Sequence, residues 1–258
     1  TGCYARAFVL PEDWAGERVV LTFHGVESVL YCWVNGQFIG YGEDGFTPTR
    51  FDITDALHAG ENLLVVQVIR FAACTWLEDQ DFWRFSGIIR DVTLTALPRA
   101  HVENVYVRTE LSEHFTKAVV NTQVKVAQYP GTEAQLTARL LDAQGAPVAE
   151  TQPMQAGAET LTIALPVENP QLWSAEDPNL YTLRLILSSN DQVIEVAQTQ
   201  VGLRKIEIVE GVLMLNGRRL RIRGSNRHEF CAEAGRCITK EHMLEDIRQY
   251  KRHNINTV

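Results

Sequence analysis

The feature that most limits how this chain can fold is its succession of strand-length runs of β-branched, aromatic and aliphatic residues, separated by Gly, Asn and Asp. Runs of this kind are typical of β-strands. In the first hundred residues they fall at Val19–Phe23, Leu30–Val34, Gln37–Tyr41, Leu63–Phe71 and Ile88–Leu97. Helical periodicity is almost absent there, so we expect a sandwich or jelly roll, with residues 51–57 as one helical turn.

Asn35-Gly36 separates two of these runs, and Asn216-Gly217 separates two later ones. Both residue types tolerate a positive φ, so each pair predicts a tight type I′ hairpin. The later hairpin is expected to join strands at Val212–Leu215 and Arg218–Arg223. Within the second of these, Leu220 and Ile222 alternate with arginines, as in a strand.

A second set of strands is expected after residue 98, with a clear alternation of apolar and polar residues that predicts one buried and one solvated face. About a hundred residues with six or seven strands is the size of an immunoglobulin-like sandwich. Trp173 and Tyr181 could stack on a ligand, but a buried anchor at a sandwich corner is the better interpretation. The expected strands are Val102–Leu111, Ala118–Val126, Leu136–Leu141, Leu161–Val167, Leu180–Leu187 and Val193–Val201.

From Thr239 the period changes to that of a helix, because Met243, Ile247 and Tyr250 recur at helical spacing. Thr239 is a suitable N-cap, and Asn254 can end the helix. The last four residues, 255–258, are expected to form a strand. Strand, loop, helix and strand make one β/α unit, the start of a barrel that needs ~250 residues when whole.

The totals exclude several functional classes. No apolar run approaches the ~20 residues of a membrane span, and the first residues show neither an initiator methionine nor a signal peptide. We therefore expect the sequence to begin inside a longer protein. A net charge of -8 argues against nucleic acid or an anionic membrane as partner and favours a neutral ligand.

The five cysteines are odd in number and scattered, which favours free thiols in a reducing compartment, hence a cytoplasmic protein. His228-Glu229 beside Cys231 and Cys237 could form a zinc site. The spacing matches no CxxC pattern, so unliganded thiols are the preferred interpretation.

Two stretches could carry chemistry. Residues 76–84 place three carboxylates among three large aromatics, which suits a sugar ring or a hard cation. The alternative is a solvated acidic loop whose aromatics lie under the sandwich, and composition alone favours it. In Asn226–Glu229, His228 stands beside a carboxylate after a predicted strand, where a β/α fold keeps its chemistry. It could be a general base, a metal ligand or a hydrogen-bond donor to substrate, but a capped loop with Arg227 and Glu229 in local ion pairs explains the pattern equally well.

The chain resembles the bacterial, lactose-hydrolysing β-galactosidases of glycoside hydrolase family 2 over its whole length. Related glucuronidases and mannosidases share the Arg-Gly pair and the Asn-Gly hairpin but differ at the Glu-Asp-Gln-Asp stretch. The segments that carry the resemblance are Thr1–Tyr4, Val34–Gly36, Leu77–Arg84 with Ser86–Ile88, Leu172–Glu176, Leu215–Gly217 and Ile222–Glu229.

The resemblance implies a mainly β chain with a jelly-roll sugar-binding domain at 1–99, an immunoglobulin-like sandwich at 100–204 and the start of a TIM barrel at 205–258. It implies that Asp81 ligates sodium and contacts the C6 hydroxyl of galactose. It also implies that His228 bonds a galactose hydroxyl and stabilises the transition state.

In this family the two catalytic glutamates and the magnesium ligands lie on later barrel strands, which this chain does not contain. The parent is therefore expected to be a retaining, cytoplasmic, homo-oligomeric β-galactosidase that uses Na⁺ and Mg²⁺. The 258-residue chain by itself is expected to be inactive. The alternatives are a carbohydrate-binding module and a structural scaffold.

Overall fold

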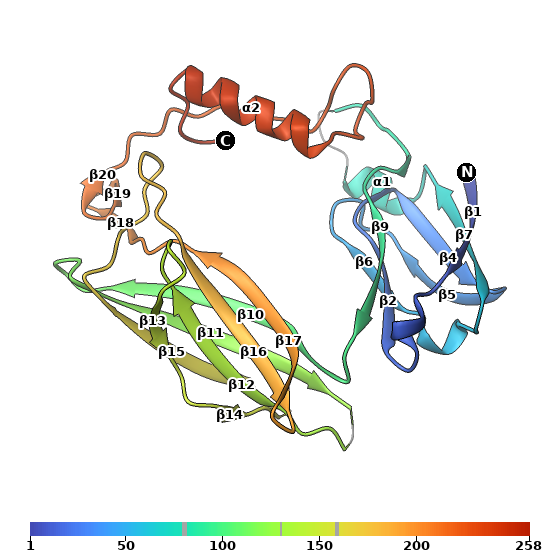
Figure 1. Cartoon of the computed structure of the whole chain (residues 1–258). Coiled ribbons are helices and arrows are strands. Elements are labelled where there is room, and N and C mark those ends of the chain that lie inside the picture. The colour runs from blue at the N-terminus through green and yellow to red at the C-terminus, as the bar shows by residue number, and fades with distance from the viewer. Residues whose placement is uncertain (79–81, 130, 158–159) are drawn as a thin grey trace. The chain divides into compact units, whose positions relative to one another are not determined.

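The computed structural model describes residues 1–78, 82–129, 131–157 and 160–258 (Figure 1). Two compact units are present. The first contains Thr1–Leu97, Ser225–Asn256 and Val258, and the second contains Pro98–Gly224 and Thr257. Strands dominate the chain, as predicted. Among the described residues, no helix is both long and apolar enough to cross a membrane.

The first unit is a sandwich of antiparallel strands. One sheet has the order β1-β7-β4-β5, the other has the order β6-β2-β9, and β3 pairs with β8. Side chains such as Leu21 and Phe23 from β2, and Cys32 and Val34 from β4, fill the core between the sheets. The bounds are β1 Gly2–Val9, β2 Arg18–Phe23, β3 Val26–Glu27, β4 Val29–Val34, β5 Gln37–Gly42, β6 Thr49–Asp52, β7 Glu61–Ile69, β8 Gly87–Ile88 and β9 Val92–Leu97.

The predicted hairpin at Asn35-Gly36 is confirmed. Asn35 has φ 52° and Gly36 has φ 80°, which are the left-handed conformations that a type I′ turn requires. The predicted run Ile88–Leu97 is wrong as a single strand. Residues 89–91 interrupt it because β8 pairs with β3, whereas β9 pairs with β2.

The second unit is also a sandwich. A sheet of order β10-β11-β15 faces a sheet of order β13-β12-β16-β17, in which β14 also pairs with β12. One continuous core contains side chains of both sheets. The bounds are β10 Ala100–Leu111, β11 Lys117–Gln128, β12 Gln135–Leu141, β13 Pro147–Glu150, β14 Met154–Gln155, β15 Leu161–Glu168, β16 Tyr181–Ser189 and β17 Gln192–Val201.

The predicted alternation in this unit is confirmed, and the predicted buried anchor is confirmed for Tyr181 but not for Trp173, which is half-buried. Leu136, Ala138 and Leu140 point into the core with no exposed surface. Tyr181 is buried, and its hydroxyl oxygen accepts a hydrogen bond from the Gln171 backbone N–H at 2.9 Å. The Arg204 guanidinium carbon lies 4.5 Å from the centroid of the Trp173 ring, so this indole packs against a residue of its own unit.

A small antiparallel sheet follows, with β18 (Ile206–Val209), β19 (Val212–Leu215) and β20 (Arg218–Arg219). The predicted strand Arg218–Arg223 is wrong beyond Arg219. The sequence after β20 has a strand-like pattern, but residues 220–223 form no strand in the structure, and Gly224 makes an isolated parallel bridge to Thr257. That parallel bridge is the pairing expected of a β/α unit.

Two helices occur among the described residues, α1 (Ala73–Leu77) and α2 (Lys240–Arg252), besides short 3₁₀ turns at Glu12–Trp14 and Thr54–Ala56. The predicted helical turn and the helix after Thr239 are confirmed. Thr239 is the N-cap residue of α2, and Asn254 leaves the helix with φ 55°. No residue of α2 is buried.

Candidate functional site

His228 lies in the loop between Gly224 and α2, and this loop belongs to the first unit. Its imidazole stacks on the Phe82 ring, with 4.7 Å between the ring centroids and 11° between the planes. Phe82 directly follows Asp81 in sequence. His228 remains solvent-exposed, so its imidazole is both fixed on one side and accessible to a ligand.

The contact between the two segments is an aromatic cluster. Phe230 packs edge-on against Phe82 at 5.9 Å and contacts Trp83 at 4.8 Å, both measured between ring centroids. Trp76 and Trp83 are 65% and 62% exposed. The interpretation that placed the aromatics of residues 76–84 under the sandwich is therefore wrong for both tryptophans, because both are largely exposed to solvent. Exposed indole rings of this kind suit contact with a sugar face.

Ion pairs hold the loop on either side of His228. Arg227 Nε lies 2.7 Å from Asp246 Oδ2 on α2, and Glu229 Oε2 lies 3.1 Å from Arg90 Nη2. The Arg227–Glu229 pair is longer, at 4.0 Å. The interpretation of local ion pairs is confirmed, although both residues have a closer partner elsewhere. The Arg90–Glu229 pair is partly solvated, so its contribution to stability is at most about 1 kcal/mol.

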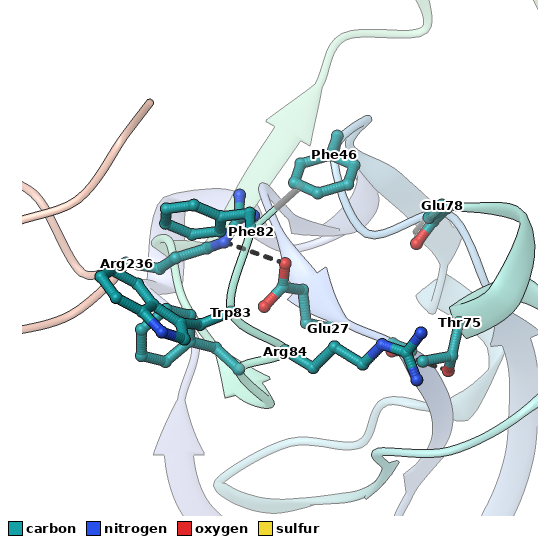
Figure 2. A pocket seen from close by; sticks show the side chains of 10 residues that line it. Glu27, Phe46, Thr75, Glu78, Phe82, Trp83, Arg84 and Arg236 are labelled. Atoms are coloured by element: carbon teal, nitrogen blue, oxygen red, sulfur yellow. Dashed lines mark hydrogen bonds and ion pairs between the residues drawn. The ribbon is translucent and has the colours of Figure 1, made fainter. Parts of the chain in front are cut away.

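A recess lies beside this cluster (Figure 2). Arg236 reaches into it and pairs with Glu27, with 3.1 Å from Arg236 Nε to Glu27 Oε1. The cavity has a volume of about 40 Å³, which is room for a few water molecules and too little for a hexose. Further lining residues include Phe46, Thr75 and Glu78. The recess therefore supports the surrounding loops and cannot by itself hold a sugar.

Burial raises the pKa of Glu27, the Arg236 charge lowers it, and the nearby Glu78 raises it further, with a net upward shift. The Glu78 carboxylate also accepts a hydrogen bond from the Gly45 backbone N–H at 3.0 Å. Two carboxylates, those of Glu27 and Glu78, therefore line the recess together with the buried guanidinium of Arg236.

Asp81, the predicted sodium ligand and substrate contact, lies outside the described residues, as do Asp79 and Gln80. Within the described part of the chain, no group of three or more His, Cys, Asp or Glu side chains could hold a metal ion. All five cysteines are free thiols.

Three family models match the chain in sequence order. The sugar-binding domain of glycosyl hydrolases family 2 matches residues 1–98, the family 2 domain matches 100–204, and the family 2 TIM-barrel domain matches 206–258. The chain belongs to glycosyl hydrolase family 2.

Relatives within family 2 include β-galactosidases from Halalkalibacterium halodurans and Clostridium acetobutylicum. Each is 43% identical to the whole chain, which spans 25% and 28% of their respective lengths. The chain thus spans about a quarter of the length of these two relatives. The crystal structure of a β-glucuronidase from Bacteroides uniformis superposes with a TM-score of 0.87 at 25% identity, covering 96% of this chain and 32% of that one. The predicted mainly β fold, with two sandwiches and the beginning of a barrel, is confirmed by the family 2 models.

Sequence reasoning singled out His228 and the segment that contacts it, but it did not single out Glu27, Phe46 or Arg236, which lie beside them. These three residues come from separate segments of the family 2 chain and meet only in the folded unit. No local spacing marks them.

Proposed function

We propose that this chain forms one wall of the active site of a retaining glycoside hydrolase that removes terminal β-D-galactosyl groups, such as the galactose of lactose. The observation that carries the proposal is the stacking of His228 on Phe82. It brings the Asn226–Glu229 segment against Phe82, the residue that follows Asp81 in sequence, which supports a site to which both segments contribute.

In this proposal His228 hydrogen-bonds a galactose hydroxyl and stabilises the transition state. A neutral imidazole has one donor and one acceptor nitrogen, so it can match a hydroxyl in either sense. A hydrogen bond that strengthens as charge develops on the sugar accelerates the reaction, since only transition-state interactions lower the barrier. Asp81 contacts the C6 hydroxyl and supplies an oxygen ligand to sodium.

Retaining hydrolysis needs a proton donor and a nucleophile about 5–5.5 Å apart. We assign both to glutamates of the longer protein, beyond this chain. The 258-residue chain alone should therefore hydrolyse no chromogenic galactoside. Measurable turnover by pure chain, abolished by its own carboxylate variants, would contradict this assignment.

The test of the function uses the whole protein. It should hydrolyse p-nitrophenyl β-D-galactoside, and His228→Ala should lower kcat/KM by about a hundredfold, the usual cost of one transition-state hydrogen bond. His114→Ala, at an exposed histidine of the second unit, is the matched control. Equal activity of the His228 and His114 variants would refute the assigned role.

The likeness to a β-glucuronidase structure supports a second substrate, a β-D-glucuronide. The higher identity to β-galactosidases favours the galactoside. Comparing the two p-nitrophenyl glycosides separates them, and a preference for the glucuronide would overturn the galactoside proposal.

A third possibility is a non-catalytic carbohydrate-binding or scaffold module. Calorimetry of the chain with galactose separates these two: binding that Asp81→Ala abolishes supports a self-sufficient sugar site, whereas no binding supports a wall that needs the rest of the barrel.

A further inference from the structure

The Arg236 side chain occupies a slot between two phenylalanines. Its guanidinium carbon lies 4.4 Å from the Phe82 ring centroid and 4.9 Å from that of Phe46. Only 12% of the side chain is exposed. Planar guanidinium groups stack on aromatic faces, and the attraction grows when water is excluded. The two rings therefore hold the flat guanidinium of Arg236 by stacking on it.

Glu27 completes this slot. It extends from β3 of the jelly-roll sandwich, and only 10% of its side chain is exposed. Glu27 Oε1 lies 3.1 Å from Arg236 Nε. The guanidinium Nε has no well-aligned hydrogen bond, and Glu27 Oε2 has no hydrogen-bond partner among the described residues. Each group thus depends on the charge of the other, because a buried charge without a counter-charge is strongly unfavourable.

The Phe82 ring is shared between Arg236 and His228. The guanidinium carbon lies 4.4 Å from the ring centroid, and the His228 ring centroid lies 4.7 Å from it. Arg236 and His228 belong to the same loop before α2, and both contact Phe82 of the first unit. The position of the imidazole is therefore tied to that of the phenyl ring, and the position of the ring to that of Arg236.

We propose that Arg236 is a positioning residue: paired with Glu27 and stacked between Phe46 and Phe82, it fixes the ring on which the His228 imidazole lies. The proposal deepens the proposed function, on which it rests, because it names what holds His228 in its place. Arg236 itself touches no substrate in this scheme.

The first test needs no sugar. The imidazole proton signals of His228 are identified in the NMR spectrum of the chain by their loss in His228→Gln. Stacking on Phe82 should displace them upfield, and Phe82→Leu should return them towards the position of the exposed His114. Arg236→Met should shift them in the same direction. Arg18→Gln, which breaks the exposed Arg18–Asp52 pair of the same unit at 2.7 Å, should leave them unchanged.

Arg236→Met leaves Glu27 charged and buried, so that variant could fail to fold. The double variant Glu27→Gln with Arg236→Met removes both charges and nearly keeps the volume, so neither buried charge is left without its counter-charge. Dispersed amide signals of β2 and β4 show that the sandwich is folded. His228 signals that stay in place in this folded double variant would overturn the proposal.

In the whole protein, the double variant should lower kcat for the galactoside by about tenfold through misplacement of His228, with KM changed less. The single variant Arg236→Lys, which keeps the positive charge beside Glu27, should lower kcat less than the double variant does. If the double variant displaces the His228 signals but the unaltered whole protein has no galactosidase activity, the proposed function is refuted and the positioning role stands. Full activity with unmoved His228 signals would refute the positioning role alone.

Discussion

At the scale of single residues, Asn62 stabilises the first unit by closing the loop before β7. It is 1% exposed, and its side chain makes four hydrogen bonds. Oδ1 accepts from Asn35 Nδ2 at 2.7 Å and from the His58 N–H at 3.0 Å. Nδ2 donates to the carbonyls of His58 and Gly60 at 3.0 and 3.1 Å. The loop before β7 is therefore held by one side chain.

Replacing Asn62 by Ala should lower the free energy of unfolding of this unit by about 1–3 kcal/mol, because buried partners lose their hydrogen bonds. Urea unfolding followed by tryptophan fluorescence measures the change. Gln37→Ala, at an exposed residue of the same sandwich, is the control. Equal midpoints for the two variants would contradict the role of Asn62.

Asp52 gives the first unit a pH dependence. Burial alone would raise its pKa, but hydrogen bonds from Thr54 and the ion pair with Arg18 outweigh burial and lower it. The stabilisation is present above the unfolded pKa of about 3.9 and is lost as the pH falls through the lower folded value.

Asp52→Asn should therefore cost stability at pH 7, by less than about 1 kcal/mol since the pair is partly solvated. The difference from the native chain should vanish at a pH below the folded pKa. Unfolding midpoints measured from pH 7 to pH 2 test this, with Asp55→Asn as the exposed neighbouring control. A difference that grows on acidification would give the opposite sign and refute it.

At the scale of elements, α2 is secured less firmly than the sandwiches. Leu244 and Ile247 are 41% and 51% exposed, and the Arg227–Asp246 pair is its closest ion pair to another segment. We predict that limited trypsin digestion cuts within Lys240–Arg252 before it cuts β10 or β11, and that α2 amides exchange fastest among the regular elements. Early cleavage inside β11 with α2 intact would contradict this.

The alternation in β12 and the Asn-Gly turns predicted their elements because burial and turn geometry act locally. β1 was missed since most of its residues are exposed and its apolar pattern is weak. It is a strand because it pairs with β7 from Gly2 to Val9. The extension of β20 was predicted in error for the opposite reason, since residues 220–223 alternate as in a strand but do not extend the sheet of β18, β19 and β20.

The same distinction holds for the candidate site. His228 could be singled out because it stands beside polar neighbours in a short segment. Glu27 and Arg236 could not, since a buried ion pair between distant segments depends on the folded core and leaves no spacing in the sequence. Local patterns predicted the group that faces solvent, whereas its support is visible only in three dimensions.

At the scale of the whole molecule, the reactivity of the cysteines distinguishes buried from exposed parts of the chain. Burial raises the pKa of the Cys32 thiol to about 12, so it remains protonated and unreactive at pH 8. Cys3 and Cys237 are exposed and should react with a thiol reagent within minutes in the native chain. Cys32 should react only after denaturation. Rapid native labelling of Cys32, located by mass spectrometry, would show that the first core is not closed.

The Asn216 side chain has a practical consequence for anyone who shortens this chain. Its Oδ1 accepts from the Lys205 backbone N–H at 2.9 Å, and its Nδ2 donates to the Trp173 carbonyl at 3.0 Å. A second sandwich trimmed at residue 204 would lose the hydrogen bond that Asn216 donates to the Trp173 carbonyl. A chain shortened after Gly224 keeps both hydrogen bonds of Asn216. The boundary for a stable second unit should therefore be placed after this hairpin and not at residue 204.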